Sequence, residues 1–151
     1  MNTPSSCPND PAPPGRKPRA LVIDDDDQMR KWMHKVLELK GFAVESAPEG
    51  VRGMYSFLDR SADVVVCDLF MPDKEGLETI LELRSLSPEV RIIAVSGGGA
   101  VFQMDQLPTA EAFGADRTLK KPFTEEELME AVDALLNPSS RGPMEIGRAH
   151  V

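Results

Sequence analysis

The stretch Leu21-Val22-Ile23-Asp24-Asp25-Asp26-Asp27 joins an apolar run directly to consecutive aspartates. An apolar run that ends abruptly in carboxylates is typical of a buried strand that delivers negative charge to the edge of a sheet. Carboxylates packed this closely repel one another unless a cation lies among them. Because Mg²⁺ is usually held by one or two carboxylates with water and phosphate, the stretch indicates either a metal site or a solvated acidic turn.

Strand and helix patterns alternate along the chain. Strands are predicted at 20–24, 42–46, 64–67, 91–95 and 117–120, the second of them at an edge. Helical apolar spacing follows in four places, at Met29, Trp32, Met33, Val36 and Leu37; Val51, Met54, Tyr55 and Leu58; Leu77, Ile80, Leu81 and Leu83; and Leu128, Ala131, Val132 and Leu135. A further helix is predicted near 105–113, where Pro108 must begin or kink it. The alternation predicts parallel βαβ units, a doubly wound α/β fold with helices on both faces of the sheet.

Residues with defined conformational preferences mark several helix ends. Gly41 suits the C-cap of the first helix, and Pro48 can open the second. Asp26 and Asp27 are expected to be solvated or to cap the first helix, where a carboxylate suits the helix dipole. Thr124, with Glu127 three residues on, forms a capping box for the last helix.

Composition bounds the domain organisation. Residues 1–19 are rich in Pro, Ser and Asn, and residues 138–151 in Pro, Ser and Gly, so both are predicted to be disordered tails around one domain at 20–137. The terminal segment 145–151 resembles a cloning-derived addition. Neither tail has room for an output domain, so we expect a stand-alone domain.

Charge and apolar content narrow the classes of partner. The formal charge is −8, and because residues 1–19 and 138–151 contribute +2 and +1, residues 20–137 carry −11, which argues against direct nucleic-acid binding. No apolar stretch approaches the roughly 20 residues of a membrane span, and Met1 opens no signal peptide. Cys7 and Cys67 form no disulfide framework. We therefore expect a cytoplasmic protein without a membrane partner.

Charged and hydroxyl side chains stand at the ends of the predicted strands. Asp24 and Asp25 end the first strand, Asp68 the third, Ser96 the fourth and Lys121 the fifth. In parallel α/β sheets the carboxyl ends of the strands meet at one edge, where ligands bind. Carboxylates would bind a divalent cation there, and a hydroxyl and an ammonium would receive phosphoryl oxygens. Positioning and charge neutralisation are most of what phosphoryl transfer requires.

These segments, in this order, resemble the receiver domain of bacterial two-component response regulators. The motifs are Leu21–Asp25, Val66–Gly76, Val95–Gly97 and Lys120–Phe123, and the resemblance covers about 19–137. It implies a flavodoxin-like five-stranded parallel sheet in the order 2-1-3-4-5. It also implies a signalling protein of the stand-alone, single-domain type.

The resemblance assigns roles to single residues. Asp68 would be the phosphoacceptor. Asp25 and Asp68 would ligate Mg²⁺ directly, Asp24 would act through water, and the backbone carbonyl of Phe70 would complete the protein ligands. Ser96 would donate a hydrogen bond to the phosphoryl group.

Lys121 would pair with the phosphoryl group. The Lys121–Pro122 bond would be cis, because the energetic preference for the trans form is small before proline. Thr118 stands where many receivers carry an aromatic residue or His that turns inward on activation, so the usual gate is in doubt and switching is expected to order residues 97–108. Phe70 and Gly98 replace polar side chains that position water in some receivers, which predicts a long-lived phosphoryl group.

The implied function is a two-state switch. A histidine kinase or histidine phosphotransfer protein would phosphorylate Asp68, and the repacked face around the helix near 105–113, the strand at 117–120 and the last helix would contact a downstream protein. The only chemistry expected is self-phosphorylation and slow autodephosphorylation, so the chain would not be a conventional enzyme. Homodimer formation through that face stays open.

Two alternatives remain beside this hypothesis. In a haloacid-dehalogenase-type phosphatase, Asp24 would be the nucleophile and Asp26 the acid-base residue, but Asp68 would have no role. A receiver-like binding module would keep the fold and work without phosphorylation. An EF-hand is excluded, because the loop positions that need Gly and Glu hold Met29 and Lys35.

Overall fold

The structure, a computed structural model, describes residues 16–69, 75–97 and 114–136. Its core is a five-stranded sheet in the order β2-β1-β3-β4-β5. All four strand pairs are parallel. The strands are β1 (Arg19–Ile23), β2 (Ala43–Ala47), β3 (Val64–Asp68), β4 (Arg91–Ser96) and β5 (Arg117–Lys120). The predicted sheet and its order are confirmed, with β2 at an edge.

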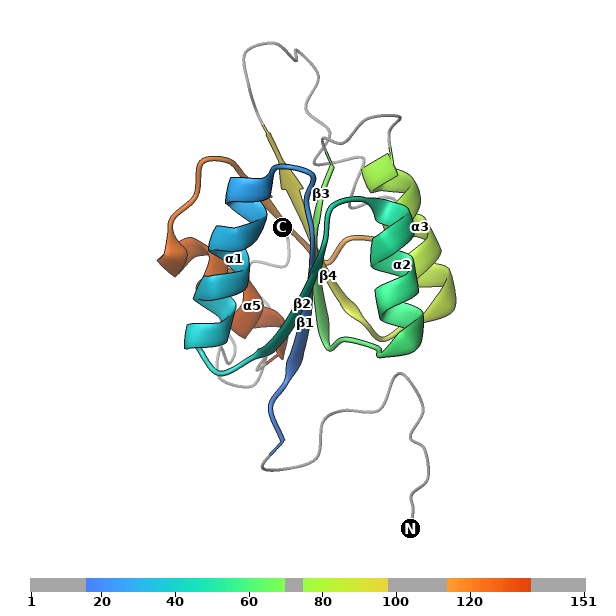
Figure 1. Ribbon diagram of the computed structural model, residues 1–151, viewed down its shortest axis with the longest axis horizontal. Coiled ribbons are helices and arrows are strands. Elements are labelled where there is room, and N and C mark those ends of the chain that lie inside the picture. Colours follow the sequence, from blue (N-terminus) through green and yellow to red (C-terminus); the bar gives the residue numbers. More distant parts are fainter. Residues whose placement is uncertain (1–15, 70–74, 98–113, 137–151) are drawn as a thin grey trace, which may run out of the picture.

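Helices cover both faces of this sheet (Figure 1). The described helices are α1 (Asp27–Leu39), α2 (Gly50–Asp59), α3 (Glu75–Leu86) and α5 (Glu125–Leu136). In Figure 1, α1 and α5 lie on one side of the strands, and α2 and α3 lie on the other. The helix expected near 105–113 lies outside the described residues, as do residues 1–15 and 137–151 of the predicted tails.

The uninterrupted apolar strands follow from this layering. Successive side chains of a strand point to opposite faces, so a sheet covered on both sides needs apolar residues at every position. In β3, Val64 and Val66 enter the core beneath α1 and α5, while Val65 and Cys67 enter the core beneath α2 and α3. The three central strands therefore support two separate cores.

Local capping explains where the helices begin and end. The Asp26 carboxylate accepts hydrogen bonds from the backbone N–H groups of Gln28 and Met29, so Asp26 is the N-cap of α1, as predicted. Gly41 has φ of 99° just beyond α1, a conformation that favours glycine. Thr124 and Glu127 make the reciprocal bonds of a capping box, at 3.0 and 2.9 Å. The prediction for Pro48 was wrong, since Glu49 is the N-cap of α2 and the helix begins at Gly50.

The predicted apolar face of α2 was also wrong. Met54 is buried, but Val51, Tyr55 and Leu58 are 55%, 70% and 63% exposed. The helix instead turns Gly50, Gly53, Met54 and Phe57 toward the sheet. A Cβ atom on Gly53 would lie 2.4 Å from the Ile23 side chain, so glycine lets the helix lie close to β1. Glycine contributes nothing to a hydrophobic pattern, which is why spacing alone misplaced this face.

The other helices follow their predicted faces more closely. Met33, Val36 and Leu37 of α1 are buried, and so are Leu128, Ala131 and Val132 of α5. In α3, Ile80 and Leu83 are buried as expected, but Leu81 is 51% exposed and Thr79 is buried. The prediction for α3 was therefore wrong at Leu81 and correct at Ile80 and Leu83.

Candidate functional site

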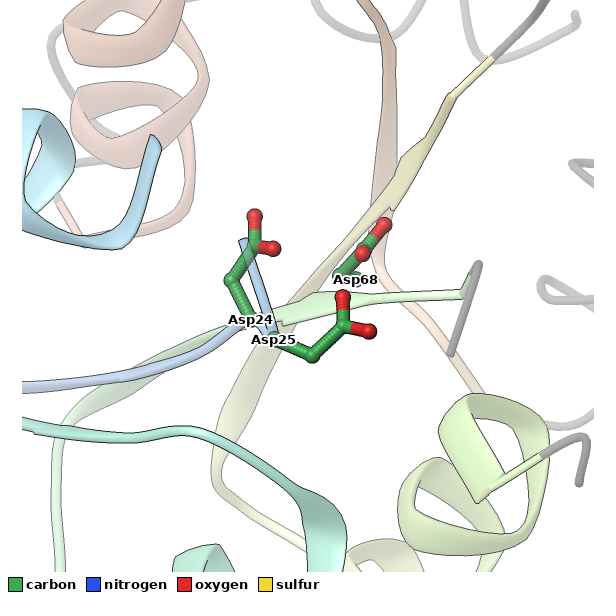
Figure 2. Close-up of side chains that lie close together, drawn as sticks. All are labelled: Asp24, Asp25 and Asp68. Carbon is green, nitrogen blue, oxygen red and sulfur yellow. The ribbon is translucent and has the colours of Figure 1, made fainter. Parts of the chain in front are cut away.

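Three carboxylates meet at the carboxyl edge of the sheet. Asp24 and Asp25 follow the last residue of β1, and Asp68 is the last residue of β3. The strands are neighbours, and the register that pairs Ile23 with Cys67 brings their ends level. One oxygen from each carboxylate lies within 4.8 Å of the others, and Figure 2 shows the side chains gathered at this point. The convergence predicted for these three residues is confirmed.

Two of the three carboxylates in this cluster are buried, which makes their negative charge costly in free energy. Asp24 is 0% exposed and Asp68 is 2% exposed, while Asp25 lies at the surface. A buried carboxylate needs hydrogen bonds or a nearby cation to offset its lost hydration. The Asp24 carboxylate accepts a bond of 2.9 Å from the Asp26 backbone N–H.

Lys121 supplies a positive charge to the cluster. Its ammonium Nζ lies 3.3 Å from Asp24 Oδ2 and 3.8 Å from Asp68 Oδ1. The Lys121 backbone N–H donates to the Ser96 carbonyl at 2.9 Å, which joins the end of β4 to the chain after β5. Next to it, the Phe123 ring packs against Trp32 of α1, with centroids 5.8 Å apart. The Lys121–Pro122 bond is cis, as predicted.

Arg30 holds the turn that carries the aspartates. Its Nη1 donates to the Asp24 backbone carbonyl at 2.9 Å, and its Nη2 donates to Asp27 Oδ1 at 2.6 Å. The Arg30 side chain is only 16% exposed. We did not predict this role. The spacing of Asp27 and Arg30 on one helix face indicates their ion pair, but the bond to the Asp24 carbonyl depends on the path of the turn.

Gly76 lets α3 approach the end of β3. A Cβ atom at this position would lie 2.4 Å from the Asp68 carbonyl oxygen and 2.6 Å from Leu69 Cα. Both are backbone atoms that cannot move aside easily. Gly76 belongs to the motif that carried the resemblance, but only the packing of α3 explains why it is glycine.

The roles predicted for Ser96, Thr118, Phe70 and Gly98 stay predictions. Ser96 ends β4, and Thr118 in β5 pairs with Ala94 in β4. Side chains alternate along a strand, so Ser96 and Thr118 lie on the same face of the sheet as Ala94, the α2 and α3 face. Phe70, Gly98 and most of 97–108 lie outside the described residues.

The residues present fit a divalent cation. Three carboxylates and one ammonium leave a formal charge of −2 among Asp24, Asp25, Asp68 and Lys121. The donor atoms are all carboxylate oxygens, the ligands that Mg²⁺ prefers. Asp24 and Asp68, which are both buried and both contact the Lys121 ammonium, would be stabilised by such an ion.

The fold and the site together define an α/β protein with an acidic cluster that fits a divalent cation at the carboxyl edge of a parallel sheet. The chain belongs to the response regulator receiver domain family, whose sequence profile matches residues 20–133. Receiver domains are the phosphorylation-controlled switches of two-component signalling. They are phosphorylated by histidine kinases and bind Mg²⁺ at an acidic pocket.

Curated relatives support this assignment. Response regulator MprA of Mycobacterium sp. (strain KMS) is 35% identical over 122 residues, which cover 81% of this chain and 52% of that protein. Transcriptional regulatory protein PrrA of Mycobacterium tuberculosis is 35% identical over 119 residues, which cover 79% of this chain and 50% of that protein. The chain thus spans about half the length of these relatives.

Solved structures show the same fold. A response regulator receiver domain protein from Clostridium thermocellum superposes with a TM-score of 0.72 at 29% identity, covering 82% of this chain and 97% of that one. The receiver domain of the Francisella response regulator 1452 gives 0.70 at 26% identity, covering 82% and 99%.

The position of Asp26 bears on the phosphatase alternative. The Asp26 carboxylate, the acid-base residue of the phosphatase alternative, is engaged in capping α1. The family assignment likewise favours the receiver over the phosphatase. None of the helices in the described residues combines the length and apolar content of a membrane span.

Proposed function

We propose that Asp68 is the phosphoacceptor, and that a histidine kinase or a histidine phosphotransfer protein is the donor. The observation that carries this is the placement of the buried Asp68 carboxylate beside Asp24 and Asp25, with Lys121 Nζ 3.8 Å from its Oδ1. An Asp68 carboxylate oxygen attacks the phosphorus. The phosphorus–nitrogen bond to the donor histidine breaks, and its electron pair returns to the imidazole.

Asp25 and Asp68 would hold Mg²⁺ directly, Asp24 through water, and Phe70 through its backbone carbonyl. When bound, the ion offsets the negative charge that the phosphoryl oxygens bring to the acidic edge. Asp24 is well placed for an indirect role, because its carboxylate is already bonded by the Asp26 N–H and Lys121.

Lys121 and Ser96 would then respond to the phosphoryl group. The Lys121 ammonium contacts both Asp24 and Asp68, so a small movement carries it to a phosphoryl oxygen on Asp68. The Ser96 hydroxyl would donate to another oxygen. Because Lys121 N–H is bonded to the Ser96 carbonyl, the two responses are linked through the backbone.

These movements would alter the surface at the ends of β4 and β5, which a downstream protein recognises. Thr118 is smaller than the residue that many receivers use as a gate, so the response is proposed to pass through ordering of 97–108. Hydrogen exchange of that segment before and after phosphorylation tests this, and unchanged exchange would contradict it. Autodephosphorylation is proposed to be slow, and a phosphoryl half-life of seconds would contradict that.

Intact-mass spectrometry after treatment with acetyl phosphate and Mg²⁺ tests the phosphoacceptor. The chain should gain a single phosphoryl group, and Asp68→Asn should gain none. Asp26→Asn is a matched control, because asparagine caps a helix about as well as aspartate. This control should label normally. Labelling that persists in Asp68→Asn, or that vanishes in Asp26→Asn, would contradict the proposal.

A further inference from the structure

A hollow lies at the other end of the sheet, where the strands begin. Its volume is about 730 Å³. The starts of β1 and β2 form one side, the end of α2 and the chain just after it form another, and Leu86 of α3 completes it. The acidic cluster lies at the other end of β1, beside the end of β3, so this hollow is separate from the candidate phosphorylation site.

The hollow is bordered by positive charge. Arg16, Lys17, Arg19 and Arg60 all line it, against Asp59. Arg19 is committed to the fold, because its backbone N–H donates to Asp63 Oδ2 at 2.8 Å and its Nε donates to the Ser61 carbonyl at 3.0 Å.

The other three cations are available to a partner. Arg16, Lys17 and Arg60 are exposed, and none of them takes part in an ion pair between described residues. Residues 20–137 carry −11 in total, so Arg60, together with Arg16 and Lys17 from the segment before β1, forms a cationic rim beside an otherwise acidic domain.

Apolar side chains border the same hollow. Phe57 is buried in its wall, while Leu58 and Leu86 line it and remain 63% and 49% exposed. Leu58 also continues a line of exposed side chains along α2, with Tyr55 at 70% and Val51 at 55%. These positions are spaced as neighbours on one helix face, and that face turns away from the protein's own core.

We propose that this hollow binds an acidic segment of a partner protein that also carries apolar side chains. Carboxylates of the segment would pair with Arg16, Lys17 and Arg60, and an apolar side chain would pack between Leu58 and Leu86. Charge complementarity identifies the occupant. An acidic segment is repelled by most of this domain and attracted to the cationic hollow, which directs the encounter to that place.

Other polyanions fit less well. Nucleic acid and anionic membranes are bound by wide basic surfaces, because each phosphate contact adds a small electrostatic increment. Here three cations, which form no ion pair within the part of the chain that the structure describes, surround a concave, partly apolar site on a domain of strong negative charge. The proposal goes beyond the phosphorylation function and does not depend on it.

Fluorescence anisotropy with the full chain and a labelled helical peptide tests the proposal. The peptide has glutamate on one face and leucine on the other. We expect saturable binding that weakens at least about tenfold when Lys17→Glu and Arg60→Glu are combined, a loss of about 1.4 kcal/mol. Leu58→Ser should weaken binding as well. The control Lys31→Glu, an exposed charge reversal on α1, should bind normally.

Matched peptides separate the two contributions. Replacing the glutamates by lysine should abolish binding, and replacing the leucines by serine should weaken it. Asp68→Asn should bind the acidic peptide as well as the original chain does, so failure of the phosphorylation proposal leaves this test intact. Circular dichroism of each variant confirms that it is folded.

Three outcomes would overturn the proposal. One is acidic-peptide binding that Lys17→Glu with Arg60→Glu leaves unchanged. Another is a ¹⁵N chemical-shift map in which the peptide perturbs the acidic cluster instead of residues 57–61. The third is charge-dependent binding of phosphatidylglycerol vesicles or duplex DNA by these residues without binding of the acidic peptide, which would assign the hollow to a different class of partner.

Discussion

The two edges of the sheet use charge in opposite ways. At the carboxyl edge, three carboxylates from β1 and β3 share a small space with Lys121, and their negative charge exceeds the positive charge beside them. At the amino edge, arginine side chains are bonded to the backbone, and additional cations border an open hollow. Among the described residues, one edge therefore carries an unbalanced negative charge, and the other uses charge to hold the fold and has further cations around an open hollow.

Arg84 shows how the amino edge is held. From the last turn of α3 it donates to the carbonyls of Gly114, Pro88 and Val90 and to the Asp116 carboxylate. Asp116 in turn accepts from the Ile92 backbone N–H at 2.8 Å. This network joins α3 to the beginnings of β4 and β5. The acidic edge has Arg30 as its corresponding support.

Of the two edges, the amino edge is expected to show the larger effect on stability. Arg84→Ala removes several bonds and leaves carbonyl groups without this donor, so it should lower the free energy of unfolding by about 3 kcal/mol. Urea unfolding measures this change. Arg52→Ala is the matched control, since Arg52 forms an exposed pair with Glu49 and its loss should cost below about 1 kcal/mol. Equal effects of both substitutions would show that the network does not hold this edge.

The acidic edge should respond to Mg²⁺ by gaining stability. An ion that binds only the folded chain at a hundred times its Kd adds about 2.7 kcal/mol, so Tm should rise on adding Mg²⁺. Asp25→Ala should lose most of that gain. Without Mg²⁺ the same substitution should leave Tm unchanged or raise it, because it removes one of the mutually repelling carboxylates. Thermal unfolding with and without Mg²⁺ measures both, and an undiminished Mg²⁺ effect in Asp25→Ala would exclude that residue as a ligand.

Arg30 should affect the acidic edge more modestly. Arg30→Gln removes the double contact with Asp24 and Asp27, and outer residues that orient metal ligands typically change affinity by about tenfold or more. Calorimetric titration with Mg²⁺ should show weaker binding. Lys31→Gln removes a neighbouring exposed charge and serves as the control. If both variants bind Mg²⁺ equally, Arg30 acts only through its charge.

The smallest effect is expected on the exposed face of α2. Tyr55→Ser should change the free energy of unfolding by less than about 0.5 kcal/mol, because Tyr55 is 70% exposed. Phe57→Ser, two residues along, should cost about 3 kcal/mol or more, because Phe57 is only 4% exposed. Chemical unfolding of the pair checks whether α2 is oriented as the structure has it. A large loss for Tyr55→Ser would place that residue in the core.

Most of the fold could be predicted because its signals are local. The apolar run of Val64–Cys67 and the capping box at Thr124 each depend on a few neighbouring residues. Parallel strands then bring their ends to one edge, so Asp24, Asp25 and Asp68 could be placed together. Their type and position determined the candidate site and the family without any knowledge of side-chain contacts.

Long-range packing decided what remained. The rotation of α2 depends on the packing of Gly53 against Ile23, and the closeness of α3 depends on the packing of Gly76 against Asp68. Because glycine has no side chain, the sequence pattern gives no sign of these contacts. The supports made by Arg30 and Arg84 use backbone carbonyls, which every residue carries. Sequence by itself determined the strands, their order and the acidic edge. Only the tertiary structure decided which helix face is buried, what holds each edge and where the cationic hollow lies, because those depend on atoms brought together from distant parts of the chain.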